Sequence, residues 1–242
     1  MPLFSTKRPI APAAVVVQWA TLFPGQPRLT SSGAKKGVVT FSAGHREVMA
    51  IQIPLPVPKQ EALAAVSTSW MWQRPDDPVS THVAHAIVTA LGADDPVQSA
   101  WDVARVSAAM LHAGSGVALY WGSSRQVHVP GIVTDFAAEE GSPPVCLWVG
   151  ITLSAESLAG PFSAATHGLE ALGHKEFEVL ASTKGIGALR ATLLDVAGYV
   201  LAAGPVLLDG QTFGPTANDR WTVRHTKGEL VPGRDVIVLG IP

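Results

Sequence analysis

The sequence predicts an α+β fold, a mixed and largely antiparallel sheet with amphipathic helices packed on one face. Residues 37–42 and 47–53 alternate between apolar and polar side chains, which is typical of two paired strands. Residues 97–113 and 187–203 repeat apolar side chains at three- and four-residue steps, which indicates helices with one buried stripe. Further short apolar runs outnumber these helices, so strands are expected to dominate.

The first half of the predicted fold mixes strands and helices. Its elements are a strand over 13–19, a hairpin over 37–53 that turns at 43–46, a short helix over 60–66, a strand over 81–91, a helix over 97–113 and a strand over 116–121. Three prolines within residues 54–58 lack backbone donors, so this segment leaves the sheet. Asp95 and Pro96 form a typical helix start, which places the next helix directly after them.

The second half repeats this mixture. Its elements are a helix over 129–138, a strand over 144–153, a hairpin of 160–169 and 175–181 across Gly173-His174, a helix over 187–203, and short strands over 206–208, 220–225 and 235–239. No Gly/Ser-rich or charged linker separates the two halves. We therefore predict a single domain over 1–242, with a first half of about 13–125 interlocked with a second half of about 126–242.

The composition narrows the classes of partner. The chain has 242 residues, of which 47% are apolar and only 15% charged, so it can fill a substantial core and is not disordered as a whole. The 17 Lys and Arg against 19 Asp and Glu leave a net charge of −2. Because nucleic acid is usually bound by a basic surface, we expect no nucleic-acid partner.

The cysteine content and the apolar runs bear on location. Cys146 is the single cysteine, and its apolar neighbours predict a buried strand that keeps the thiol inert. The basic and apolar opening shares features with a secretory signal, but Pro9 and Pro12 interrupt it. No uninterrupted apolar stretch reaches the ~20 residues that span a bilayer as a helix. We therefore expect a cytoplasmic protein that has no membrane partner.

Several separated stretches carry a family resemblance. They are Ser69–Trp72, Thr81–Val88, Gly116–Gly122, Leu147–Ile151, Thr166–Leu169, Gly173–Val179, Val196–Leu201 and Leu207–Gly214. In this order they resemble the bacterial family called domain of unknown function 4261, from about the second strand to the C-terminus. The resemblance implies no assigned activity; it implies stand-alone bacterial proteins, some near secretion-system and toxin–immunity loci. The Pro- and Gly-rich opening departs from the family pattern.

The histidines and acids of the second hairpin form the strongest candidate for chemistry. Its members are His167, Glu170, His174, Glu176 and Glu178. Imidazole and carboxylate groups can bind borderline metals, but His174 lies at the turn and Glu170 need not share a face with His167. We therefore predict a solvated hairpin and neither a bound metal nor a cofactor.

Other catalytic signals are weak. His82 and His85 are three residues apart, so on a strand they point to opposite faces and cannot bind one ion together. The sequence contains no Gly-x-Ser-x-Gly elbow and no complete phosphate-binding loop. These absences favour a binding protein over an enzyme.

The tryptophans suggest a surface for a partner. Trp70 and Trp72 share one face of an extended segment and lie beside polar residues such as Arg74, and Trp121 stands near a predicted loop. Aromatic rings with a polar rim are typical of interface anchors, although core packing explains most tryptophans. These four residues are our candidates for partner binding.

Two hypotheses for function follow. The first is non-enzymatic binding of a protein partner, in the form of an immunity-type protein that neutralises a co-encoded bacterial toxin. The alternative is a hydrolase or small-molecule enzyme with a site in the groove between the halves. Its site candidates are His82, His167, Glu170 and His174, with His82 or His167 as the base.

Overall fold

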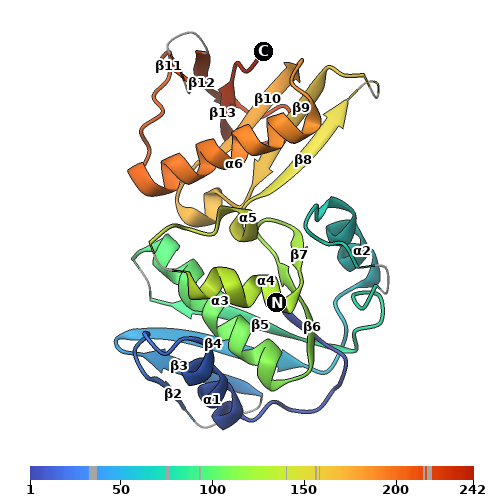
Figure 1. The fold of residues 1–242 in the computed structure, drawn as a ribbon, viewed down its shortest axis with the longest axis vertical. Coiled ribbons are helices and arrows are strands. Elements are labelled where there is room, and N and C mark those ends of the chain that lie inside the picture. The colour runs from blue at the N-terminus through green and yellow to red at the C-terminus, as the bar shows by residue number, and fades with distance from the viewer. Residues whose placement is uncertain are drawn as a thin grey trace. The chain divides into compact units, whose positions relative to one another are not determined.

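The computed structural model describes residues 1–32, 37–74, 77–92, 94–139, 141–155, 157, 159–214, 216 and 220–242. It confirms the α+β class, with helices packed against two mostly antiparallel sheets (Figure 1). The chain divides into two compact units, an N-terminal unit of Met1–Leu147 and a C-terminal unit of Trp148–Pro242.

The N-terminal unit is built on a seven-stranded sheet with the order β2-β3-β4-β5-β1-β6-β7, in which every neighbouring pair is antiparallel. The strands are β1 (Pro2–Phe4), β2 (Leu29–Ser31), β3 (Val38–Ala43), β4 (Arg46–Ile53), β5 (Ala84–Leu91), β6 (Gly116–Trp121) and β7 (Gln126–His128). The predicted hairpin is confirmed, because Ala43 pairs with Arg46 across the turn between β3 and β4.

The N-terminal unit also contains helices. They are α1 (Pro12–Leu22), α2 (Lys59–Thr68), α3 (Pro96–Ala113), α4 (Pro130–Ala138) and the short α5 (Val145–Trp148), which ends at the boundary of the unit. The central helix is α3, which packs on β1, β4, β5 and β6 and contacts α1 and α4 (Figure 1). Asp95 caps α3 as predicted, since its Oδ1 accepts hydrogen bonds from the N–H groups of Val97 (2.9 Å) and Gln98 (3.1 Å).

The C-terminal unit has a six-stranded sheet with the order β11-β12-β13-β10-β9-β8. Its elements are β8 (Gly150–Ala155), β9 (Phe162–His167), the 3₁₀ turn η1 (Glu170–Leu172), β10 (Glu176–Ser182), α6 (Ile186–Ala203), β11 (Thr212–Phe213), β12 (Trp221–Lys227) and β13 (Asp235–Leu239). β10 and β13 run parallel and the other pairs antiparallel. Helix α6 packs on β8 and β9 through a stripe that includes Leu189, Leu193 and Val196, as predicted.

The prediction of a first strand over 13–19 was wrong, because this run is helix α1. Pro12 stands at the first position of the helix, where its missing N–H costs nothing. Val15 and Trp19, four residues apart, are buried, whereas Val17 between them is 61% exposed. That spacing is helical, and β-branched valine is only a weak argument against a helix.

Two further strand predictions were wrong. Residues 145–148 of the predicted strand over 144–153 form α5 and only 150–155 form β8, so Cys146 lies on a helical turn after Pro144 rather than on a strand. Residues 206–208 form no strand: Leu207 is buried between exposed Val206 and Leu208, as on a strand, but the Val206 N–H bonds to Gly204 within its own loop instead of to a neighbouring strand.

Candidate functional site

His82 is a structural residue of the N-terminal unit, located just before β5. Its imidazole is 6% exposed, and Nε2 accepts a hydrogen bond from the Val57 N–H at 2.8 Å. Because Nε2 is the acceptor, Nδ1 carries the proton and donates to the Val79 carbonyl at 2.5 Å. Both nitrogens of this neutral ring are therefore occupied in joining the loop before α2 to the loop before β5.

The candidates on the second hairpin do not converge. Nε2 of His167 lies 2.9 Å from Thr152 Oγ1 on the neighbouring strand β8. Glu170 is exposed and forms an ion pair with Arg234. Burial lowers the pKa of His174, at the turn between the two strands. Among the described residues no group of three His, Cys, Asp or Glu side chains could share a metal ion.

The prediction that Glu176 and Glu178 lie on a solvated hairpin was wrong, because both are buried. Glu178 is 0% exposed. Its carboxylate accepts hydrogen bonds from the N–H groups of three successive residues, Glu229 (3.0 Å), Leu230 (2.9 Å) and Val231 (2.8 Å). These bonds fix the loop that precedes β13. Alternation on a strand gave their common face, but not the loop that covers it.

Glu176 fixes the turn between β9 and β10. It accepts hydrogen bonds from the Thr166 hydroxyl at 2.7 Å and from the Gly168 N–H at 2.8 Å. Burial raises the pKa of Glu176, and these donors oppose the shift. Both acids that suggested chemistry in the sequence therefore have structural roles.

The tryptophan candidates fall into two groups. Trp70 is 37% exposed at the end of α2, and Arg74 is exposed beyond it. Trp72 is half-buried and packs against the core cluster that contains Val57 and Tyr120. Trp121, on β6, is 8% exposed, which leaves it little surface to offer a partner. The structure thus divides a predicted patch into one exposed ring and two packed rings.

Cys146 shows no sign of activation. It is half-buried, and burial raises the pKa of its thiol, so the thiol is protonated at neutral pH. The unreactive thiol that we predicted is retained on a helical turn instead of a strand.

The C-terminal unit contains an aromatic groove with a volume of about 370 Å³. It is lined by Lys184, Thr192, Asp195, Val196, Tyr199, Phe213, Gly214 and Trp221. Phe213 and Trp221 pair across β11 and β12, and their rings meet edge to face at 5.8 Å. Tyr199 of α6 stacks on Phe213 at 5.5 Å with an interplanar angle of 25°. The three rings form a continuous series that joins the helix to the edge of the sheet.

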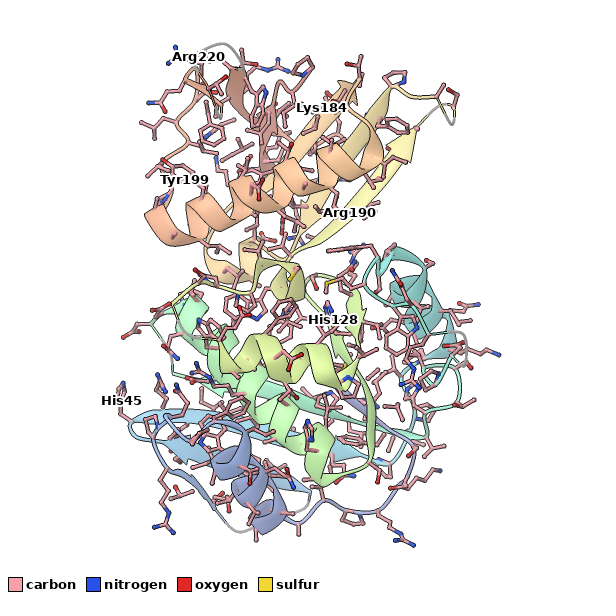
Figure 2. All side chains as sticks on the ribbon, in the orientation of Figure 1. His45, His128, Lys184, Arg190, Tyr199 and Arg220 are labelled. Atoms are coloured by element: carbon pink, nitrogen blue, oxygen red, sulfur yellow. The ribbon has the colours of Figure 1, made fainter. Side chains whose placement is uncertain are left out.

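Exposure changes along this series of rings. Trp221 is 4% exposed and forms the floor, whereas Tyr199 is 45% exposed and forms the rim. Lys184 Nζ lies 5.7 Å from the centre of the Trp221 ring, and Asp195 lines the groove from α6. Figure 2 shows Lys184 and Tyr199 near opposite ends of α6. The groove thus presents an apolar floor between one positive and one negative side chain.

Sequence reasoning missed this groove. Tyr199 lies outside the buried stripe of α6, and an aromatic residue on the outer side of an amphipathic helix was the available signal. Phe213 and Trp221 were not linked to it, because contacts between separate segments leave no pattern in a single sequence. Their pairing across β11 and β12 comes only from the fold.

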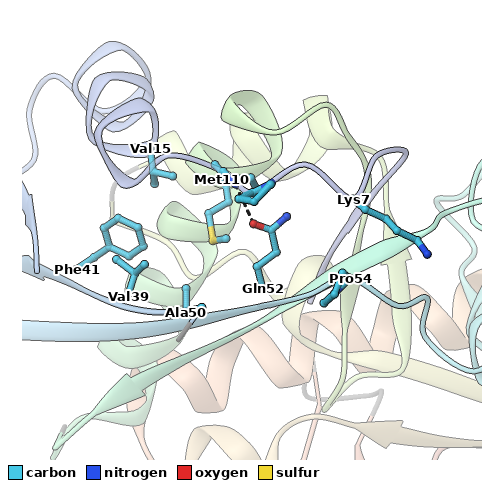
Figure 3. Close-up of a pocket in the computed structure, with 11 residues that line it drawn as sticks. Lys7, Val15, Val39, Phe41, Ala50, Gln52, Pro54 and Met110 are labelled. Carbon is cyan, nitrogen blue, oxygen red and sulfur yellow. Dashed lines mark hydrogen bonds between the residues drawn. The ribbon is translucent and has the colours of Figure 1, made fainter. Parts of the chain in front are cut away.

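Two other hollows lie in the N-terminal unit. The polar pocket, about 240 Å³, is lined by residues such as His45, Arg46 and Asp102. Arg46 Nε lies 3.2 Å from Asp102 Oδ2; burial raises the pKa of Asp102 and Arg46 opposes this. The apolar pocket, about 260 Å³, lies between α1, α3 and the sheet (Figure 3). Neither pocket contains His82 or His85.

Helix α6 is long and apolar enough to span a membrane by length and composition alone. Its 18 residues have a mean hydropathy of 1.5, and 28% of them are buried. The core helix of a soluble protein meets the same criteria. Its buried stripe packs on β8 and β9.

The structure thus defines an α+β protein whose C-terminal unit carries an aromatic groove and whose buried acids serve its loops. Residues 165–240 match the family described as Domain of unknown function (DUF4261), so the resemblance to that family is confirmed for most of the C-terminal unit. The stretches between Ser69 and Ile151 that also carry the resemblance lie outside the matched residues 165–240. No curated protein and no solved structure matches the chain. The described residues that line the aromatic groove fall within the matched segment.

Proposed function

We propose that this chain is a non-enzymatic binding protein that holds a protein partner at the aromatic groove. The observation that carries the proposal is the series Tyr199, Phe213 and Trp221, which runs from a half-exposed rim to a buried floor. Tyr and Trp are enriched among the residues that dominate binding energy, because they bury a large area with few rotatable bonds.

The charges of the groove favour a peptide chain as the occupant. Lys184 and Asp195 line the groove with opposite charges. They can therefore interact with the polar groups of a peptide chain on either side of an apolar side chain that enters the groove. The rim is open and Tyr199 is 45% exposed, which suits an anchor side chain from a larger surface.

The partner we propose is a co-encoded bacterial toxin. The family resemblance implies members near toxin–immunity loci, and an immunity protein needs a stable scaffold and a complementary surface but no catalytic group. The aromatic groove offers such a surface, which supports the proposal of an immunity protein. The buried acids Glu176 and Glu178 also support it, because they fix the loops of the scaffold.

The test is co-expression of the full chain with each gene product encoded beside it, followed by pull-down and a growth-rescue assay. We expect one neighbour to be toxic, to co-purify with this chain and to be neutralised by it. Tyr199→Ala should weaken both capture and rescue, whereas Trp70→Ala, a matched change at another exposed ring, should leave both unchanged. The reverse outcome would move the site to the predicted tryptophan patch and refute the groove.

Two controls separate rival classes. The apolar outer residues of α6 also suit a lipid surface. Sedimentation of the chain with anionic vesicles that Tyr199→Ala abolishes would therefore overturn the proposal of a protein partner.

For the enzyme alternative, we expect elemental analysis after dialysis to find no tightly bound transition metal. About one equivalent of zinc, lost when His167 and His174 are replaced together, would favour a metal-dependent hydrolase instead.

A further inference from the structure

The apolar pocket of the N-terminal unit has a fully buried inner wall. Its inner wall consists of four buried side chains, Val15, Phe41, Ala50 and Met110, each at most 4% exposed. Figure 3 shows Val15, Phe41, Ala50 and Met110 around one hollow, from α1, β3, β4 and α3. A hollow with such walls is poor at holding water, because water needs several polar partners.

The outer wall is a segment of chain held in place by one side chain. Oε1 of Gln52 accepts a hydrogen bond from the Ile10 N–H, and its Nε2 donates to the Arg8 carbonyl, both at 2.9 Å. Ile10 also packs closely on α3, since a Cβ at Gly114 would lie 2.4 Å from Ile10 Cδ1. The pocket is therefore a built feature, whose outer wall is fixed from two sides.

The chemistry of the lining selects the occupant. Among the described residues that line the pocket, Lys7 is the one ionisable side chain and none is a carboxylate. Lys7 extends from the Pro54 end of the pocket, away from the apolar wall (Figure 3). A ligand with an apolar body inside and an anionic end outside would complement both features.

Size sets the length of the apolar body. A cavity of about 150 Å³ lined by apolar side chains holds benzene, so a volume of about 260 Å³ accommodates roughly ten carbon atoms. Met110 is unbranched and flexible, which lets the wall adapt to a chain. We propose that this pocket binds a medium-chain carboxylate, with the hydrocarbon against Phe41 and Met110 and the carboxylate beside Lys7. This site is independent of the aromatic groove, because it lies in the other unit.

The test is calorimetric titration of the full chain with sodium decanoate below its micelle concentration, with 1-decanol and butyrate as comparators. We expect one decanoate to bind per chain and butyrate not to bind. Lys7→Gln should weaken decanoate roughly two- to fivefold, as for an exposed charge pair, and should leave decanol unchanged. Equal effects on both ligands, or none on either, would overturn the assignment of the carboxylate end.

Filling the pocket tests the site itself. Ala50→Leu places a larger side chain inside the hollow and should abolish decanoate binding, whereas Ala64→Leu, the same change at an exposed position of α2, should not. If Ala50→Leu does not fold by circular dichroism, Val39→Phe fills the pocket from its half-exposed side. No binding by the unaltered chain, or binding that survives in the filled variant, would overturn the proposal.

Discussion

The two units stabilise their buried carboxylates by different means. In the N-terminal unit, Asp102 interacts with two side chains, Arg46 and Gln98. In the C-terminal unit, Glu178 is held by three consecutive backbone N–H groups. Backbone donors cannot move away without unfolding the loop, so the carboxylate and the loop before β13 depend on each other. Acidic residues that suggest a catalytic or metal site in a sequence can therefore have a purely structural role.

The units also differ in their hollows. The apolar pocket is walled by aliphatic side chains and one phenylalanine, and a segment fixed by Gln52 closes it. The aromatic groove is open, and its rings reach the surface at Tyr199. The first shape suits a small apolar molecule and the second suits a side chain of a larger partner.

The largest effect is expected where the backbone depends on a side chain. Glu178→Ala leaves three N–H groups without their acceptor, and at about 1–3 kcal/mol each the C-terminal unit should lose roughly 3–9 kcal/mol of stability. Urea unfolding measures this. Glu229→Ala, which removes an exposed carboxylate from the same loop, is the control and should change little. Equal losses in both variants would mean that the backbone bonds contribute little.

Apolar packing comes next. Leu193 of α6 is 0% exposed, so Leu193→Ala should destabilise the C-terminal unit by roughly 2–5 kcal/mol through lost burial and a cavity. Thermal melting measures it, with Leu208→Ala at a residue 55% exposed as the matched control. An unchanged melting temperature would contradict the packing of α6 on its sheet.

Acid should affect the stability of the two units in opposite directions. His128 on β7 is 1% exposed; burial lowers its pKa to about 4, although the Leu147 main chain opposes this in part. Below pH 6.5 the unfolded chain binds a proton that the folded ring does not, so stability falls by about 3 kcal/mol as pH drops from 6.5 to 4. The raised pKa of Glu176 acts in the opposite sense, because its burial penalty disappears when the carboxyl is protonated.

His128→Leu tests this acid effect. The substitution should reduce the loss of stability of the N-terminal unit between pH 6.5 and 4 and leave the C-terminal unit unaltered, as followed by hydrogen exchange of each unit. Burial also lowers the pKa of the Met1 amine, to about 5, so part of the loss should remain. The raised pKa of Asp102 counteracts His128 only where that carboxyl becomes protonated. An identical pH profile in the variant would show that His128 does not carry the acid sensitivity.

The sequence predicted most elements but not the site, for reasons visible in particular residues. Helix α3 was predictable because Asp95, Pro96 and the apolar stripe agree locally. Strand β1 was not, since Pro2–Phe4 pairs with β5 and β6, more than 75 residues away in the order of the chain. Likewise, Tyr199 and Phe213 meet only through the packing of α6 beside β11. Long-range pairing of this kind leaves no periodic signal.

The most direct test of the account is the affinity of the full chain for its protein partner, measured by titration for the unaltered chain, Tyr199→Ala and Trp70→Ala. The account predicts that Tyr199→Ala weakens binding about 30-fold, or about 2 kcal/mol, with an unchanged melting temperature, and that Trp70→Ala has no effect. Unchanged affinity in Tyr199→Ala, with a loss in Trp70→Ala, would contradict the aromatic groove as the binding site.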